Sequence, residues 1–194
     1  HCSVRRQRQM CIRDSFSDLG AQPKNTIGNI KLDVEFGFAL SLAEKASRLK
    51  KLGFENSDSA SDRPLTLIGA STWPGEESLL LKAQKHCLNS GVPCQLIIVP
   101  RHVERRGKIQ KLLNEQPLPW ASVSGNFGNR TSMDEGSQAI FFSDTTGRLI
   151  DLLKLADLAF IGKSMPPNNG GQTPIEAAAP VSYTHLTLPT NGTV

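Results

Sequence analysis

Short runs of apolar residues alternate with amphipathic segments through most of the chain. Four runs have the length of buried strands, residues 65–70, 95–99, 139–142 and 158–161, and residues 120–123 are a shorter candidate. Apolar positions recur at helical spacing in residues 39–52, 76–89, 103–114 and 149–156, and another helix is predicted to begin at residues 173–176. Strands that alternate with helices through short connections predict an α/β fold, a Rossmann-like layered domain with a parallel sheet.

Polar residues and glycines gather where the predicted strands end. Because successive parallel strands bring their carboxyl ends to one edge of the sheet, we expect these residues to surround a ligand there. The candidate binding residues are Ser71, Thr72, Pro100, Arg101, His102, Asp144, Thr145, Thr146, Gly147, Gly162, Lys163, Ser164, Gly170, Gly171, Gln172, Thr173 and Glu176. Helix N-termini at the same edge present free N–H groups, which suit a phosphate.

Two of these residues suggest particular contacts with a nucleotide. Arg101 can add a charge-assisted hydrogen bond to a phosphate. Glu176, in the first turn of the last predicted helix, can accept hydrogen bonds from ribose hydroxyls, as the acidic residue of dinucleotide folds does. Each residue also has an ordinary interpretation, Arg101 as a surface arginine and Glu176 as a partner of the helix dipole.

Several sharper motifs fail on spacing. Residues 162–164 read Gly-Lys-Ser, but a P-loop would need a glycine where Asp157 stands. His86 and Cys87 lie inside a predicted helix, which favours a packed pair over a nucleophile and its base. Glu76 and Glu77 point to different sides of the next helix, so they do not form a general acid/base pair by themselves.

Composition narrows the class of protein. The chain has 194 residues, 38% of them hydrophobic, which fits one globular domain. The net charge of +4 comes from four arginines in residues 1–13, and the rest of the chain is neutral, so we predict no nucleic-acid partner. The four cysteines have no metal-ligand spacing, and Cys87 and Cys94 are expected to be reduced core thiols, so no metal site is predicted.

The two ends differ in character from the rest. Residues 5–14 have no periodicity, and residues 181–190 interrupt the chain where a helix has begun. Both strings resemble translations of sequencing-adapter DNA. The predicted organisation is therefore a tail at 1–14, an incomplete nucleotide-sugar-binding domain at 15–179 and a tail at 180–194; a genuine basic tail and a genuine C-terminal strand are the alternative.

Five separated motifs in order resemble the 3-deoxy-D-manno-octulosonic acid (Kdo) transferases of lipopolysaccharide synthesis. They are GNIKLD at 28–33, IGASTWPGEE at 68–77, LIIVPRH at 96–102, SDTTGRL at 143–149 and GKSMPPNNGGQTPIEAA at 162–178. The resemblance implies the C-terminal, donor-binding domain of a two-domain GT-B glycosyltransferase. It implies transfer of Kdo from CMP-Kdo to a lipid A precursor at the cytoplasmic face of the bacterial inner membrane, with inversion and without a cofactor or bound metal.

The resemblance also assigns roles to residues. It implies that Arg101 holds the phosphate, that Glu176 holds the ribose, and that Ser71 and Thr72 line the cleft. The family's general base belongs to the N-terminal domain, so no residue of this chain is assigned that role, and the chain alone is expected to bind CMP weakly and to lack transferase activity. The family usually has His where this chain has Trp73. It also differs around Thr146 and Arg148, and at the Gly171-Gln172-Thr173 segment.

Two alternatives remain open from the residues alone. One is another GT-B-like enzyme, a UDP-sugar transferase or a sugar-nucleotide epimerase, which should prefer UDP over CMP. The other is a non-catalytic α/β module that binds a nucleotide or another anion.

Overall fold

A computed structural model describes most of the central part of the chain. The described residues are 40–54, 63–125, 127–128, 139–166, 168 and 171–172, together with Gly20. The chain forms two compact units, His1–Glu35 and Phe36–Val194, and all described residues except Gly20 belong to the second. Gly170, Thr173, Glu176, the predicted helix start at 173–176, the GNIKLD motif and both predicted tails lie outside the described residues, so the predicted domain limits stay predictions.

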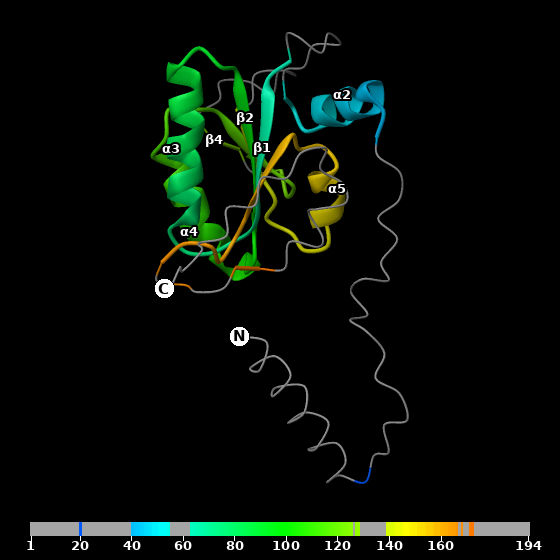
Figure 1. Ribbon diagram of the computed structural model, residues 1–194. Coiled ribbons are helices and arrows are strands. Elements are labelled where there is room, and N and C mark those ends of the chain that lie inside the picture. The colour runs from blue at the N-terminus through cyan, green and yellow to red at the C-terminus, as the bar shows by residue number, and fades with distance from the viewer. Residues whose placement is uncertain are drawn as a thin grey trace, which may run out of the picture. The chain divides into compact units, whose positions relative to one another are not determined.

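The second unit is built on a sheet that contains five parallel strands (Figure 1). The parallel strands are β1 (Leu65–Thr72), β2 (Cys94–Pro100), β3 (Trp120–Ser122), β5 (Ile140–Phe142) and β6 (Leu158–Ile161). The spatial order is β4-β3-β5-β2-β1-β6, and β4 (Phe127–Gly128) pairs antiparallel with β3 at the edge. The predicted α/β class with a parallel sheet is confirmed.

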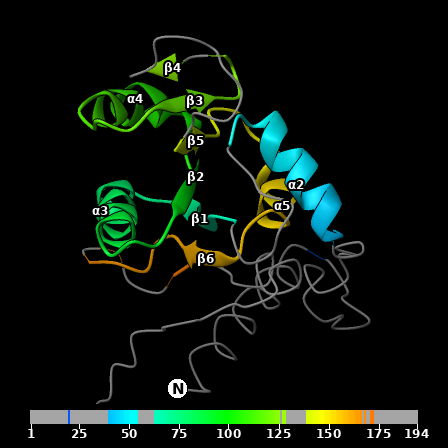
Figure 2. The ribbon, with the colours of Figure 1, turned by 90° about the horizontal axis from the view of Figure 1, so that it is seen from above.

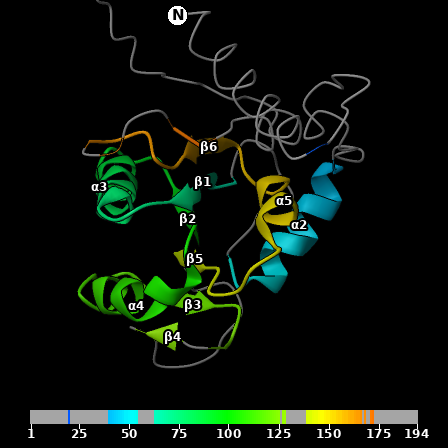
Figure 3. The same ribbon diagram turned by 90° about the horizontal axis from the view of Figure 1, so that it is seen from below.

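Helices cover both faces of this sheet (Figures 2 and 3). One face packs against α3 (Glu76–Asn89) and α4 (Arg106–Asn114), which follows the 3-10 turn η2 (Val103–Arg105). The other face packs against α2 (Leu42–Lys51) and α5 (Leu149–Leu153). Because the strands are parallel, the chain must cross back over a face of the sheet between one strand and the next. The helices in these right-handed crossovers therefore form layers on the two faces.

The central strand β2 shows why continuous apolar runs predicted this sheet. All seven of its residues are buried, because helices cover both sides of the strand. Leu96 and Ile98 pack toward α3 and α4, whereas Ile97 and Val99 pack toward α2 and α5. The two-residue period of the strand thus divides the apolar core into two layers.

The elements differ from the sequence prediction in several places. Helix α2 begins at Leu42 rather than at residue 39, and residues 103–105 form the turn η2 before α4 begins. Helix α5 ends at Leu153, although Leu155 and Ala156 are also buried, because these two residues pack into the core from the turn that follows the helix. Strand β4 lies in the segment that the sequence predicted as a polar loop. A two-residue antiparallel edge strand has too short a pattern for periodicity to reveal.

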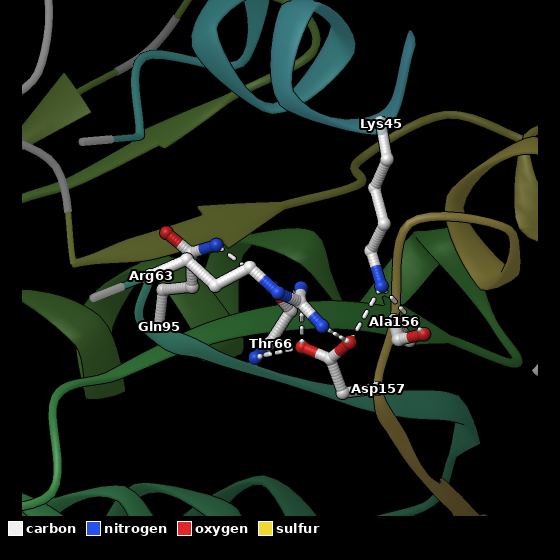
Figure 4. A network of polar contacts seen from close by, with 6 residues as sticks. All are labelled: Lys45, Arg63, Thr66, Gln95, Ala156 and Asp157. Carbon is white, nitrogen blue, oxygen red and sulfur yellow. Dashed lines mark hydrogen bonds and ion pairs between the residues drawn. The ribbon is translucent and has the colours of Figure 1, made fainter. Parts of the chain in front are cut away.

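A polar network at the amino end of β6 ties α2 to the sheet (Figure 4). The Asp157 carboxylate accepts hydrogen bonds from Lys45 Nζ at 2.6 Å, from both terminal nitrogens of Arg63 at 2.7 and 3.2 Å, and from the Thr66 backbone N–H at 2.9 Å. Burial alone would raise the pKa of Asp157, but the Arg63, Lys45 and Thr66 contacts outweigh it and lower the pKa below 3.8. The ionised carboxylate therefore stabilises the fold.

We expect Asp157→Asn to lower the free energy of unfolding at pH 7 by about 2 kcal/mol, because two cations lose their partner. The pKa of Asp157 is lowered on folding, so its contribution is complete above the unfolded value of 3.8 and is lost as pH falls through the folded pKa. Urea unfolding from pH 7 down to pH 3 measures this. Asp151→Asn, on an exposed site of α5, is the control. A difference between wild type and Asp157→Asn that stays constant to the lowest pH would contradict the assignment.

Candidate functional site

Four neighbouring parallel strands end at one edge of the sheet, as the sequence predicted. In the order β5-β2-β1-β6, they are followed by the turns at residues 143–147, 101–102, 73–75 and 162–164, respectively. We call this the carboxyl edge. The carboxyl edge of an open parallel sheet is where such folds bind ligands.

The turns after β1 and β6 are in direct backbone contact. A Cβ added to Gly162 would lie 2.0 Å from the Ser71 carbonyl oxygen and 2.9 Å from Thr72 Cα, so only glycine fits. Ser71 and Lys163, on the two sides of this contact, have φ values of 55° and 64°. Left-handed backbone at non-glycine residues costs free energy and is concentrated at functional sites. Gly162 is therefore a packing position, and its predicted contact with a ligand stays a prediction.

The buried carboxylate of Glu76 holds these two turns together. Its Oε2 accepts hydrogen bonds from the backbone N–H groups of Trp73 at 2.7 Å and Lys163 at 3.0 Å, and its Oε1 accepts from Ser164 N–H at 2.9 Å. Met165 N–H adds a longer contact of 3.4 Å. Glu76 is only 1% exposed. In the Gly-Lys-Ser turn, which resembles a phosphate cradle in the sequence, the Lys163 and Ser164 N–H groups are thus occupied by this side chain, and the Gly162 N–H donates to the Ala70 carbonyl.

Two side chains from two different turns, His102 and Lys163, converge on Trp73. The His102 ring packs edge-on against the indole with 5.4 Å between ring centroids, and the Lys163 ammonium lies 5.3 Å from the indole centroid. His102 follows β2 and Lys163 follows β6, on either side of β1. We call these residues the Trp73 cluster. Lys163 and His102 can each donate a hydrogen bond at this edge, where an anion is expected to bind.

Thr72 and Glu77 belong to a buried network behind the edge. Thr72 is fully buried, and its hydroxyl donates to Glu77 Oε1 at 2.8 Å. Arg105 donates to both carboxylate oxygens of Glu77, at 3.0 and 2.9 Å, and to the Thr72 carbonyl oxygen at 3.3 Å. Thr72, predicted to line the cleft, supports the edge from inside through its side chain, and its contact with a ligand stays a prediction.

Asp144 is also turned into the protein. Its carboxylate accepts hydrogen bonds from the Ser124 hydroxyl and, at 3.0 Å, from the Ser124 backbone N–H. Burial would raise the pKa of Asp144, but hydrogen bonds from the Ser124 side chain and backbone outweigh this and lower it. The following residues, Thr145, Thr146 and Gly147, are exposed. Asp144 therefore anchors the turn, while the exposed residues form its surface.

Some of the remaining predicted residues are exposed at the carboxyl edge, and others hold its turns together. Arg101 and His102 are exposed, whereas Pro100 is buried, and the Arg101 backbone N–H donates to the Thr72 carbonyl at 3.1 Å. Gly171 and Gln172 donate backbone hydrogen bonds to Lys163 and Gly162, both at 2.9 Å, which brings this segment to the same edge. The sequence did not single out Trp73, Glu76 or Arg105 as parts of the site. A large aromatic and two adjacent acids directly after a buried strand were the available signal.

Metal ligands, cysteines and long apolar helices are the other features of the described residues that bear on function. They contain no group of three or more His, Cys, Asp or Glu side chains arranged to hold a metal ion. Cys87 and Cys94 are both free thiols, and burial, with a smaller effect of the neighbouring Cys87, raises the pKa of Cys94 to about 12. None of the described helices combines the length and apolar character needed to cross a membrane.

Comparisons with known proteins identify relatives over most of the chain, although no protein-family model matches it. A bifunctional glycosyltransferase/methyltransferase of Fusobacterium nucleatum is 32% identical over 84% of this chain and 23% of the relative. The 3-deoxy-D-manno-octulosonic acid transferase of Haemophilus influenzae is 30% identical over 80% of this chain and 33% of the relative. The chain thus spans about a third or less of the length of these relatives.

A solved structure has the same fold. The C-terminal CMP-Kdo binding domain of WaaA from Acinetobacter baumannii matches with a TM-score of 0.53 and 24% identity, over 70% of this chain and 65% of that domain. Five further transferases of the same name, from Rickettsia species, are 26–28% identical over 84–87% of this chain. The resemblance predicted from the five motifs is therefore confirmed, and the chain is related over most of its length to the 3-deoxy-D-manno-octulosonic acid transferases.

Proposed function

We propose that this chain is the donor-binding part of a glycosyltransferase that transfers Kdo from CMP-Kdo to a lipid A precursor. The observation that supports this most strongly is the similarity to Kdo transferases over 80% or more of the chain. The fold shared with a CMP-Kdo binding domain agrees with a nucleotide at that edge. In the intact enzyme, the reaction would take place at the cytoplasmic face of the inner membrane, and the anomeric centre would be inverted.

The chain's own residues would bind and orient the nucleotide. Arg101, exposed at the end of β2, would donate charge-assisted hydrogen bonds to the phosphate. The exposed turn at residues 145–147 would contact the nucleoside, and Glu176, outside the described residues, would accept from the ribose hydroxyls. The general base would come from the part of the enzyme that this chain does not cover. The carboxyl edge would thus hold CMP-Kdo, and the residues that catalyse the transfer would lie outside this chain. The reaction would need no bound metal or cofactor.

Calorimetric titration of the full chain with CMP, UMP, UDP and inorganic phosphate tests this proposal. We expect CMP to bind more tightly than UMP or UDP, and we expect Arg101→Ala to weaken CMP binding about tenfold because a phosphate contact is lost. Arg106→Ala is the matched control, since Arg106 is equally exposed but lies on α4.

The outcomes separate the alternative functions. Preference for UDP would replace the Kdo transferase with a UDP-sugar enzyme. Binding of CMP, UMP and inorganic phosphate with equal affinity would indicate an anion-binding module. Release of CMP from CMP-Kdo by the 194-residue chain alone would contradict the expectation that catalysis needs residues outside it.

A further inference from the structure

Trp73 occupies the middle of the carboxyl edge. It follows β1, which lies between β2 and β6 in the sheet, and it contacts His102 from the β2 side and Lys163 from the β6 side. Its own backbone N–H is fixed by Glu76 Oε2 at 2.7 Å. The indole ring therefore extends from a backbone held by Glu76 and contacts one side chain from each neighbouring turn.

Among the described residues, the Lys163 ammonium contacts the Trp73 ring and not an acidic side chain. The ion pairs described for the chain join Lys45 and Arg63 to Asp157, and Arg105 to Glu77. Within the described part of the chain, Lys163 forms no ion pair, and Glu76 accepts only its backbone N–H. No acidic side chain of the described residues therefore compensates the positive charge of Lys163, at an edge where a phosphate is expected. Because the turn is locked by Glu76 and by the Gly162 contact, the side chain starts from a fixed position.

The indole acts through its face rather than through its N–H group. Among the described residues, the buried Nε1–H of Trp73 has no hydrogen-bond acceptor. A buried donor without a partner destabilises a protein, so this N–H group does not account for a stabilising role. The ring face, in contrast, attracts the Lys163 ammonium and packs against His102.

We infer that Trp73 is a positioning residue of a phosphate subsite, whose ring holds the Lys163 ammonium and the His102 ring so that both can donate to the phosphate of the bound nucleotide. The inference rests on the proposed function, because it takes the nucleotide of that function as its ligand. It gives Trp73 a role in binding the phosphate and assigns that role to the face of the indole ring.

The test compares CMP with cytidine, which lacks the phosphate. The ratio of the cytidine Kd to the CMP Kd, measured by calorimetry in phosphate-free buffer, isolates the contribution of the phosphate. We expect Trp73→Ala and Lys163→Ala each to lower this ratio about five- to tenfold, and the double variant to lower it no further. Trp73→Phe keeps a ring face and should keep most of the ratio. Trp120→Phe, at the chain's other tryptophan, which is buried in the core, is the control.

A second readout does not depend on the Trp73→Ala variant folding. In the Trp120→Phe protein, Trp73 is the sole tryptophan, and its emission should change with CMP but not with cytidine. If Trp73→Ala leaves the ratio unchanged, or weakens CMP and cytidine equally, the positioning role is wrong while the proposed function stands. If the emission of Trp73 does not change when CMP binds, the positioning role of Trp73 is also wrong. Failure of the wild-type chain to bind CMP would overturn both.

Discussion

Replacing Gly162 by alanine is expected to lower the free energy of unfolding by about 3 kcal/mol or more. The added Cβ would lie 2.0 Å from the Ser71 carbonyl oxygen and 2.6 Å from its carbonyl carbon. Both neighbours are backbone atoms of β1, so no side-chain rotation relieves the overlap. Two strands would have to separate at the carboxyl edge. Urea unfolding, followed by circular dichroism, measures the loss, and CMP binding should weaken with it.

Two other glycines make a graded control series. A Cβ at Gly69 would overlap the Leu80 and Thr72 side chains, at 2.3 and 2.8 Å, so Gly69→Ala should destabilise less because side chains can move. Gly107 lies in α4 and has nothing within 4 Å of the added Cβ. Gly107→Ala should therefore stabilise the protein by about 0.5–1 kcal/mol. Equal stability of the Gly162→Ala and Gly107→Ala variants would show that the two strand ends are not in contact.

The fold was predictable because the sheet is buried on both faces. A run such as residues 95–99 has no polar position, and this is typical of a parallel strand between two layers of helices. Polar residues and glycines at the ends of such runs then mark the carboxyl edge, where open parallel sheets bind ligands. The sequence did not predict strand β4, because its two residues have no strand pattern of their own and form a strand only by pairing with β3.

The internal contacts of the site were not predictable, because they join residues far apart in the chain. The sequence places Glu76 in the first turn of a helix, and its neighbours in sequence give no sign of a backbone partner elsewhere. Its acceptor role depends on N–H groups 87 and 88 residues later. Likewise, only the close approach of the Ser71 backbone explains why residue 162 is a glycine. Sequence pattern thus located the carboxyl edge, whereas the division into supporting and exposed residues needed the structure.

These contacts make the carboxyl edge one connected unit. Glu76 joins the turn after β1 to the turn after β6, and Glu77 joins β1 to η2 through Arg105. Neighbouring acids on one helix therefore fix two different turns, which agrees with the prediction that they are not an acid/base pair. A nucleotide at this edge would meet turns whose backbone is already held in place, which lowers the entropy lost on binding.

Glu76→Gln should consequently destabilise the protein by about 3 kcal/mol, which lowers Tm by about 6–12 °C. The carboxylate is 1% exposed and accepts hydrogen bonds from backbone donors at both oxygens. A glutamine amide has one acceptor oxygen, so its NH₂ group would face backbone N–H groups and leave buried donors unpaired. Glu104→Gln, at an exposed position in η2, should change Tm by less than about 2 °C and is the control. If Glu76→Gln melts with the wild type, the carboxylate does not hold the two turns, and the rigidity of the carboxyl edge has another source.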